Sequence, residues 1–407
     1  AIQGFIGGGM IPTVFASIYT VFPRSKQAIF LPVIGLIATL APTIGPTVGG
    51  YLTDALSWHW LFFINIGPGI AVTAATFLLI DFDQPDYSLF KHFDWWGLGF
   101  MAAFLGSLEY VLEEGARYDW FDDQTISLLA VVAAVSAVAF FARVLTARSP
   151  IVDLKAFGNR NFALGSLFSF VLGIGLYGLT YLFPVYLEVI RGDNALMVGE
   201  TMFVSGIAMF LSAPFVGRLV TKVDPRLLMM AGFFIFAAGS WQMTYVTKDW
   251  DFEQLLWPQI FRGVGMMMAI VPITNLALGT LEPQRLKNAS GLFNLARNLG
   301  GAVGLATLNT VLNKRIDLHL ARLHEAITWG RQPAQEALVN LTARFQSFGA
   351  DAQTMALRQL MGLARQQGTV MAFADVFLML AVVFVVFGAL AMVMRRPAVV
   401  ARAAAGH

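Results

Sequence analysis

The sequence contains no cysteine, which excludes disulfide bridges and thiolate metal sites. Its five histidines are scattered, at spacings that suit no metal ion. Charged residues make up only 13% of the chain, about half the share that soluble domains carry. The net charge of +2 gives no basic footprint of the kind that binds nucleic acid. With so little charge, most of the molecular surface is predicted to face lipid.

Apolar residues are correspondingly abundant, at 57% of the chain, with 35 phenylalanines and a mean hydropathy of +0.67. A helix needs about 20 mostly apolar residues to cross a bilayer. Eleven stretches meet that length: 1–21, 28–52, 59–80, 95–112, 125–145, 162–189, 197–220, 227–246, 255–281, 288–312 and 371–394. We therefore predict an all-α membrane protein with eleven spans.

Lysine and arginine orient these spans, because short cytoplasmic loops are enriched in both. Alternate loops carry them, beginning with Arg24 and Lys26 and continuing through Arg143, Arg218 and Lys222. That side is predicted to be cytoplasmic. The segment 313–370 then falls on the outer side, as a long periplasmic loop in which 351–366 is predicted to form a helix.

Two parts of the chain resemble each other, which indicates an internal repeat. Gln3–Pro12 (QGFIGGGMIP) is similar to Arg262–Pro272 (RGVGMMMAIVP), and the interval from Pro12 to Pro272 equals that from Pro23 to Pro283. Parallel repeats of this kind build transporters from two matching bundles. Three helices precede the second copy, so three further helices are expected before Ala1.

This repeat divides the chain into four predicted parts. Residues 1–80 are the remainder of an N-terminal bundle with three helices, and residues 81–157 hold two inserted helices with their linkers. Residues 158–394 form a C-terminal bundle of six helices that includes the 313–370 loop, and residues 395–407 are a cytoplasmic tail.

Several short motifs occur in a consistent order along the chain. They are Ala41–Gly50 (APTIGPTVGG), Trp58–Asn65 (WHWLFFIN), Pro150–Leu154 (PIVDL), Arg160–Phe162 (RNF) and Gly217–Arg226 (GRLVTKVDPR). With these motifs the chain resembles the EmrB/QacA group of fourteen-helix drug:proton antiporters in the major facilitator superfamily. The long outer loop makes it more similar to EmrB than to QacA.

The resemblance implies a major facilitator fold of two pseudo-symmetric six-helix bundles with two inserted helices. It implies proton-coupled export of drugs or amphipathic compounds across a bacterial inner membrane, with the proton gradient and no cofactor as the energy source. It also implies a periplasmic adaptor protein and an outer-membrane channel as partners. In this group an acidic residue of the first helix is tied to proton coupling, and that helix would lie before Ala1.

The antiporter-like motif has a physical meaning of its own. Ala41, Gly45 and Gly49 are spaced by four, so they form one smooth helix face where another helix can pack closely. Pro42 and Pro46 each remove a backbone hydrogen bond, which favours a bend. Gly50 completes the motif. A bent, closely packed seam suits a gate between two bundles, although seams of small residues occur in all membrane bundles.

Two arginines are predicted to lie at membrane depth. Arg297 shares one helix face with Asn294 and Asn298. An arginine there costs about 3 kcal/mol on insertion scales, so it is expected to face a partner or a wet cavity. Arg262 lies in the 255–281 span. Both are candidates for the substrate and proton pathway, and the alternative role is bracing of neighbouring helices.

Three acidic residues near the predicted outer helix ends are candidates for proton binding. Glu200 is preferred, because no other acid lies nearby and its helix leads to the 217–226 motif. Glu109 belongs to the inserted pair and suits an interfacial position. Asp375 suits a cap at the start of the last helix. Burial raises a carboxyl pKa, which is how such a group could exchange protons near neutral pH.

The cytoplasmic motif places opposite charges in a short loop. Gly217, Arg218, Asp224 and Arg226 could latch helix ends in one conformation and release them in another. The alternative is the ordinary cytoplasmic excess of basic residues, with Asp224 as a helix cap.

The leading functional hypothesis is therefore a secondary active transporter that exports drugs or amphipathic compounds by alternating access. An exporter of one metabolite, such as a fatty acid or siderophore, is the first alternative, and a non-transporting membrane scaffold is the second. The sequence shows no cluster of His, Asp or Cys at one interface, which disfavours a membrane enzyme. It also has no GxxxxGK[ST] phosphate loop for a nucleotide-driven pump.

Overall fold

The computed structural model describes Gly7 and residues 44–79, 93–147, 150–281, 283–327 and 330–395. All regular elements in these ranges are helices, which confirms the predicted all-α class. Eight helical stretches of this part are long and apolar enough to cross a membrane. Apart from Gly7, the predicted span 1–21 and the Gln3–Pro12 motif lie outside the described residues, as do residues 28–43 of the predicted span 28–52, with Ala41 and Pro42.

The helices follow the predicted order. They are α3 (Trp60–Phe63), α4 (Ile66–Leu79), α5 (Trp95–Glu114), α6 (Gln124–Thr146), α7 (Arg160–Tyr186), α8 (Ala195–Leu219), α9 (Pro225–Gln242), α10 (Phe252–Leu278), α11 (Pro283–Ala326), α12 (Gln332–Arg344) and α13 (Ala352–Leu390). Residues 44–55 are also helical. A π-helical turn, Leu187–Arg191, extends α7. The predicted bounds from 95–112 to 255–281 agree with these helices to within a few residues.

Polar caps explain why several helices begin where they do. The carboxylate of Asp123 accepts hydrogen bonds from the first backbone N–H groups of α6, and the amide oxygen of Asn159 does the same for α7. Asn194 caps α8, and Asp224 caps α9 directly before Pro225. Asp and Asn favour this position because they bind backbone donors that have no partner inside the helix.

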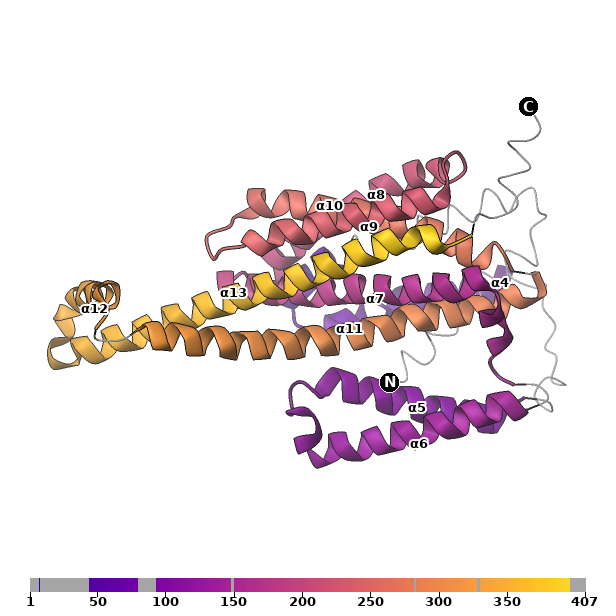
Figure 1. Ribbon diagram of the computed structural model, residues 1–407, viewed down its shortest axis with the longest axis horizontal. Helices are drawn as coiled ribbons and strands as arrows, with labels where there is room; N and C mark the ends of the chain where they lie inside the picture. The colour runs from indigo at the N-terminus through magenta and orange to yellow at the C-terminus, as the bar shows by residue number, and fades with distance from the viewer. Residues whose placement is uncertain are drawn as a thin grey trace.

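Six helices form the C-terminal bundle (Figure 1). In it α10 packs against α8 and α9, α7 packs against α11, and α13 packs against α9 and α11. The inserted helices α5 and α6 form a separate antiparallel hairpin beside this bundle, and α5 contacts α11. The indole N–H of Trp120, in the turn between them, donates a 3.2 Å hydrogen bond to the hydroxyl of Thr310.

The segment 313–370, predicted as a long periplasmic loop with one helix, is helical over most of its length. The helix expected to end at residue 312 runs on without a break to Ala326, and the last helix begins at Ala352 instead of 371. The helix predicted at 351–366 exists, as the first part of α13. We call residues 313–370, with α12 at the tip, the helical arm. Figure 1 shows α11 and α13 running side by side past the other helices to α12.

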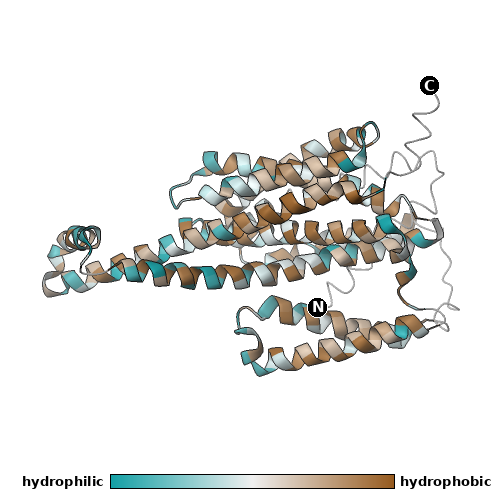
Figure 2. Ribbon diagram, in the orientation of Figure 1, coloured by the Kyte–Doolittle hydropathy of each residue, from teal (hydrophilic) through white to brown (hydrophobic). Residues whose placement is uncertain are grey.

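The missing break has a physical reason. Neither proline nor glycine occurs between residues 305 and 326, so nothing in that sequence ends the helix. Hydropathy changes along the arm while its helical structure continues: Figure 2 shows the arm and α12 rich in hydrophilic residues, next to a mostly hydrophobic bundle. The change from apolar to polar residues marks the predicted membrane boundary, but the helix does not end there.

Glycines bring helix backbones into direct contact within the bundle. A Cβ added at Gly173 of α7 would lie 2.0 Å from the carbonyl oxygen of Arg297, and one at Gly300 of α11 would lie 2.0 Å from that of Phe170. Gly232 and Gly265 bring α9 and α10 together in the same way. Close approach of this kind is how membrane helices gain packing energy, because lipid is as apolar as their side chains.

Phenylalanines fill the centre between α7, α9 and α13. The rings of Phe236 and Phe384 stack with centroids 4.0 Å apart, and Phe233 contacts both Phe384 and Phe168. Phe168, Phe233 and Phe384 are almost fully buried. This core fixes the helices that carry the polar side chains described next.

Candidate functional site

A polar cluster lies where α7 meets α11, beside the Gly173 and Gly300 contacts. The hydroxyl of Tyr177 donates a 3.0 Å hydrogen bond to Oδ1 of Asn298. The guanidinium of Arg297 lies 5.5 Å from the ring centre of Phe293, and its buried Nε has no hydrogen-bond partner among the described residues. We call Tyr177, Phe293, Arg297 and Asn298 the α7/α11 cluster. Asn294, half-buried, is on the same helix one turn earlier.

This cluster combines an aromatic ring, an amide and a cation in a mostly apolar bundle. In the described part of the chain, no carboxylate lies within ion-pair distance of Arg297. A buried charge without a partner is costly, so such groups in a membrane usually face a ligand, water or a partner in another conformation. Tyr177 is 39% exposed, so the cluster can be reached from outside the bundle. The arrangement can bind a molecule with apolar and polar parts.

Arg262, the second candidate arginine, is buried inside the bundle. It is 7% exposed, donates a 2.8 Å hydrogen bond to Oε1 of Gln259, and lies 5.3 Å from the ring centre of Phe183 on α7. The Nε of Arg262 and the Nε2 of Gln259 have no partners among the described residues. The hydrogen bond lies within α10, and the contact with Phe183 joins α10 to α7, which agrees with the bracing role of Arg262 rather than with an open pathway.

The antiporter-like motif contacts the start of α8. Thr47 donates a 3.0 Å hydrogen bond to the carbonyl of Gly199, and an added Cβ at Gly50 would lie 2.3 Å from the carbonyl oxygen of Ala195. A Cβ at Gly199 would lie 2.6 Å from the carbonyl oxygen of Pro46. A close seam therefore exists at this motif, as the sequence predicts.

The seam uses a different face of the helix from the one predicted. Within the described residues, an added Cβ at Gly45 would meet nothing within 4 Å, and one at Gly49 would contact only a side-chain atom of Leu61, at 3.4 Å. Pro46 and Gly50, also four residues apart, make the close approach to α8 instead. Which small residues form the seam depends on where α8 lies, and α8 is far away in sequence.

The three candidate acids lie in different places. Glu200 is exposed, next to the Gly199 contact and on the face of α8 that carries Ile207 and Leu211. Glu109 is exposed on α5, so it lies away from the C-terminal bundle core. Asp375 lies within α13, so its predicted role as a helix cap is wrong.

Asp375 has charged partners instead. Its Oδ2 lies 2.7 Å from Nε2 of His319 and 3.6 Å from Nε of Arg315, both on α11. The structure thus joins Asp375 to two residues of the segment that was predicted to be a loop. It does not bring Asp375, Glu200 and Arg297 into contact with one another.

The cytoplasmic motif closes a short turn between α8 and α9. Arg226 pairs with Asp224 at 2.9 Å and also donates a 3.2 Å hydrogen bond to the carbonyl of Met394, at the end of the last helix. Gly217 and Arg218 are exposed. The observed contacts fit helix capping by Asp224. In addition, Arg226 binds the backbone just after α13.

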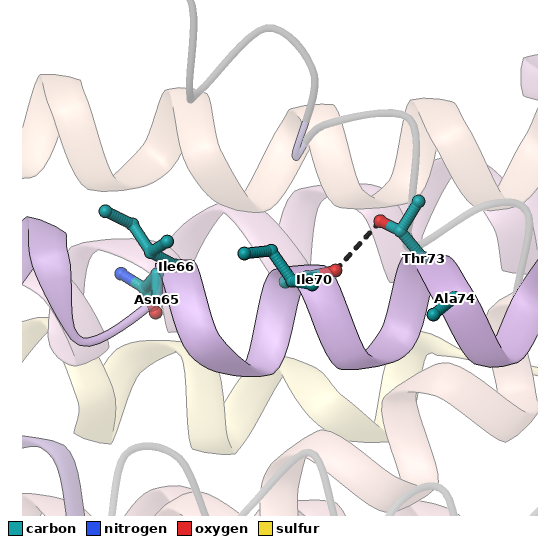
Figure 3. A pocket seen from close by; sticks show the side chains of 6 residues that line it. Asn65, Ile66, Ile70, Thr73 and Ala74 are labelled. Atoms are coloured by element: carbon teal, nitrogen blue, oxygen red, sulfur yellow. Dashed lines mark hydrogen bonds between the residues drawn. The ribbon is translucent and has the colours of Figure 1, made fainter.

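A hollow of about 510 Å³ runs along α4 (Figure 3). Its lining consists of Asn65, directly before α4, and five residues of α4 up to Ala74. The hydroxyl of Thr73 donates a 2.8 Å hydrogen bond to the carbonyl of Gly69. A groove formed by one exposed helix has no convergent polar groups, so we do not treat it as the functional site.

Five residues of these clusters were missed by sequence reasoning: Tyr177, Gln259, Phe293, Arg315 and His319. Helical spacing could have identified some of them. Gln259 lies three residues before Arg262, and Arg315 lies four before His319, so each pair shares a helix face. Tyr177 had no such signal, because its partner lies on a distant helix.

Comparison with known proteins gives this arrangement a context. A family model described as Major Facilitator Superfamily matches residues 1–305. The colistin resistance protein EmrB of Acinetobacter baumannii is 40% identical over 395 residues, covering 97% of this chain and 77% of that protein.

Two further relatives are similar over nearly the same length. The multidrug export protein EmrB of Escherichia coli K12 is 30% identical, over 95% of this chain and 74% of its own. The fatty acid resistance protein FarB of Neisseria gonorrhoeae is 31% identical, over 95% and 75% respectively.

Proposed function

This chain belongs to the Major Facilitator Superfamily, and from that premise we propose that it exports amphipathic drugs in exchange for protons. It is an integral membrane protein, with eight candidate spans in the described residues alone. The observation that carries the proposal is similarity along 95% or more of the chain to relatives named for colistin resistance and multidrug export. We place it in a bacterial inner membrane, with the proton gradient as its energy source.

The α7/α11 cluster is the proposed contact for substrate. An amphipathic molecule would place its apolar part against Phe293 and Tyr177 and its polar part near Arg297 and Asn298. Alternating access then requires two bundles to rock about such a site. The seam between Pro46, Gly50 and the start of α8 is a contact at which this movement could occur, because backbone packing there is close on both sides.

Tyr177→Phe tests the substrate contact. The change removes the hydroxyl that binds Asn298 and leaves the ring. A single hydrogen bond contributes about 0.5–1.5 kcal/mol, so we expect the half-saturating drug concentration to rise roughly two- to tenfold. Tyr181→Phe is the matched control, since Tyr181 lies one turn away and is similarly exposed at 41%. Equal transport by the two variants would remove Tyr177 from the site.

Glu200 is the proposed proton-binding acid of the pathway, because it lies beside the seam and on an otherwise apolar face of α8. Glu200→Gln, reconstituted in vesicles with an imposed pH gradient, is expected to lose uphill drug export and to retain downhill drug movement. Glu188→Gln serves as the control, because Glu188 is an exposed acid at the end of α7. Uphill export at the normal rate in Glu200→Gln would dismiss this role.

Export of fatty acids is the second candidate function. The name of the FarB relative favours it, and so does Arg297, which has no carboxylate within ion-pair distance among the described residues, because a carboxylate headgroup would neutralise that charge. A transport panel separates the two functions. Export restricted to fatty acids would replace the drug-efflux proposal, whereas export of uncharged and cationic drugs would support it.

The helical arm is the proposed docking element for a periplasmic adaptor. It projects from the C-terminal bundle and ends in α12, whose surface is rich in hydrophilic residues (Figures 1 and 2). The loss of α12 should then reduce drug resistance in cells without reducing drug transport in reconstituted vesicles. Equal resistance with and without α12 would argue against an adaptor contact at this tip.

A further inference from the structure

We propose that Arg315, His319 and Asp375 form a proton-binding site at the base of the helical arm, where a proton on His319 tightens the contact between α11 and α13. This site deepens the proposed function, on which its link to transport rests. Its proton binding can be tested without any transport measurement.

The geometry brings two basic side chains to one carboxylate oxygen. Nε2 of His319 lies 2.7 Å from Oδ2 of Asp375, the distance of a strong hydrogen bond, and Nε of Arg315 lies 3.6 Å from the same oxygen. Arg315 and His319 are four residues apart on α11, so both project toward α13. The carboxylate therefore receives both contacts across one helix interface.

The three side chains differ in exposure, and this difference suits proton exchange. The side chain of His319 is 8% exposed, whereas those of Asp375 and Arg315 are 32% and 47% exposed. A proton can therefore reach the buried ring through a carboxylate that is partly exposed. The Nδ1 of His319 is buried without a hydrogen-bond partner among the described residues, so Asp375 is the group that orients the ring.

Other charged groups lie on the arm and on the helices that pack against α11 and α13. The helices that pack against α11 and α13 bring Glu188, Arg191, Glu113 and Glu114, and the arm itself brings Lys314, Asp317, Arg322 and Arg365. Arg191 is bound to Asp193 at 3.1 Å, and Glu114 to Arg117 at 3.6 Å. In the described chain, only Arg315 and His319 lie within ion-pair distance of Asp375.

Histidine is the side chain whose charge ordinarily changes between about pH 5 and pH 8. With His319 neutral, Arg315 balances the charge of Asp375 and the site is neutral overall. Proton binding gives the site a net positive charge and turns the His319–Asp375 hydrogen bond into an ion pair. The attraction between the imidazolium and the carboxylate adds to the hydrogen bond, so the protonated site should hold α11 and α13 together more tightly.

Distance measurements between spin labels on the two helices can test this site. The chain has no cysteine, so labels can be introduced directly at Ala321 on α11 and Met361 on α13, both exposed. In the purified full chain in lipid nanodiscs, we expect the distance distribution to be clearly narrower at about pH 5.5 than at about pH 8. His319→Gln should abolish this difference, because glutamine cannot take up the proton.

Two further variants make the outcome decisive. Asp375→Asn leaves His319 in place and removes the acceptor charge, so it should also abolish the pH response. His324→Gln is the control, since His324 is exposed on the same helix, and it should leave the response unchanged. A pH response that persists in His319→Gln, or no response in the unaltered chain, would overturn the proposal. The measurement needs no drug, so a failure of drug export would refute only the proposed function.

Discussion

Replacement of Gly300 by alanine tests how closely α7 and α11 must approach for the α7/α11 cluster to form. The added Cβ would lie 2.0 Å from the carbonyl oxygen of Phe170, whereas ordinary contact begins near 3.4 Å. The difference, 3.4 minus 2.0, is 1.4 Å, and both clashing groups belong to helix backbones. The helices must therefore separate or tilt, because neither side can rotate away.

The magnitude follows from two opposing effects. Overpacking in a close-packed interior costs about 1–3 kcal/mol. Alanine is more favourable than glycine in a helix by about 1 kcal/mol, which offsets part of that cost. We expect a net loss of roughly 1–2 kcal/mol in the free energy of unfolding. The same separation would break the 3.0 Å hydrogen bond between Tyr177 and Asn298, so transport should weaken as well.

Thermal unfolding of the purified chain and drug transport in vesicles measure the two effects. Gly291→Ala is a matched control on the same helix, because no described atom lies within 4 Å of its added Cβ. The control should unfold at the same or a slightly higher temperature and transport normally. If Gly300→Ala behaves like the control in both assays, the close contact between α7 and α11 does not hold the cluster together.

Two predictions concern the cytoplasmic ends of helices. Asp94 caps α5 and binds Arg143 of α6 at 2.9 Å. Burial alone would raise the pKa of the Asp94 carboxyl, but hydrogen bonds from the Gly97 N–H and from Arg143 outweigh burial and lower this pKa. A lowered pKa means that the ionised carboxylate stabilises the fold at pH values above the ordinary pKa of aspartate, and that this stabilisation is lost as the pH falls. Asp94→Asn should therefore lower the unfolding temperature at neutral pH, and the decrease should become progressively smaller below about pH 4. Arg226→Lys should also lower the unfolding temperature, because the lysine ammonium lacks the planar, forked donor group with which Arg226 binds Asp224 and Met394 at once. Arg218→Lys is the control and should have no effect. Equal unfolding temperatures for these two lysine variants would contradict the assigned contacts.

The helices of the membrane region were predictable because each carries its own signals. Apolar length indicated the eight candidate spans of the described residues, and caps such as Asp123, Asn159 and Asn194 fixed helix starts within a few residues. These signals are local, so one sequence suffices to read them. The position of Arg297 at a helix interface was predictable for the same reason, since a charge at membrane depth requires a polar neighbour or water.

The helical arm was not predicted because polarity was interpreted as the end of a helix. Residues after 312 are charged, yet they lack the glycine or proline that would end a helix. Arg315 and His319 would have appeared as neighbours on one face if α11 had been continued. Their common partner, Asp375, could not be predicted, because that contact depends on how α11 and α13 pack. The choice of Pro46 and Gly50 for the seam depended on tertiary packing in the same way.

The unbroken helix α11 connects these separate contacts. This helix carries Arg297 and Asn298, receives the hydrogen bond of Trp120 at Thr310, and carries His319 at the base of the arm. At a rise of 1.5 Å per residue, Thr310 is about 20 Å and His319 about 33 Å from Arg297. No proline occurs between these points, and beyond Gly304 no glycine occurs either, so α11 has none of the usual positions for a kink from Leu305 to His319. A tilt of this stretch of α11 would therefore move Thr310 against the inserted pair and His319 against α13. A change in the His319–Asp375 contact must in turn bias the tilt at the cluster, because coupling between two sites acts equally in both directions.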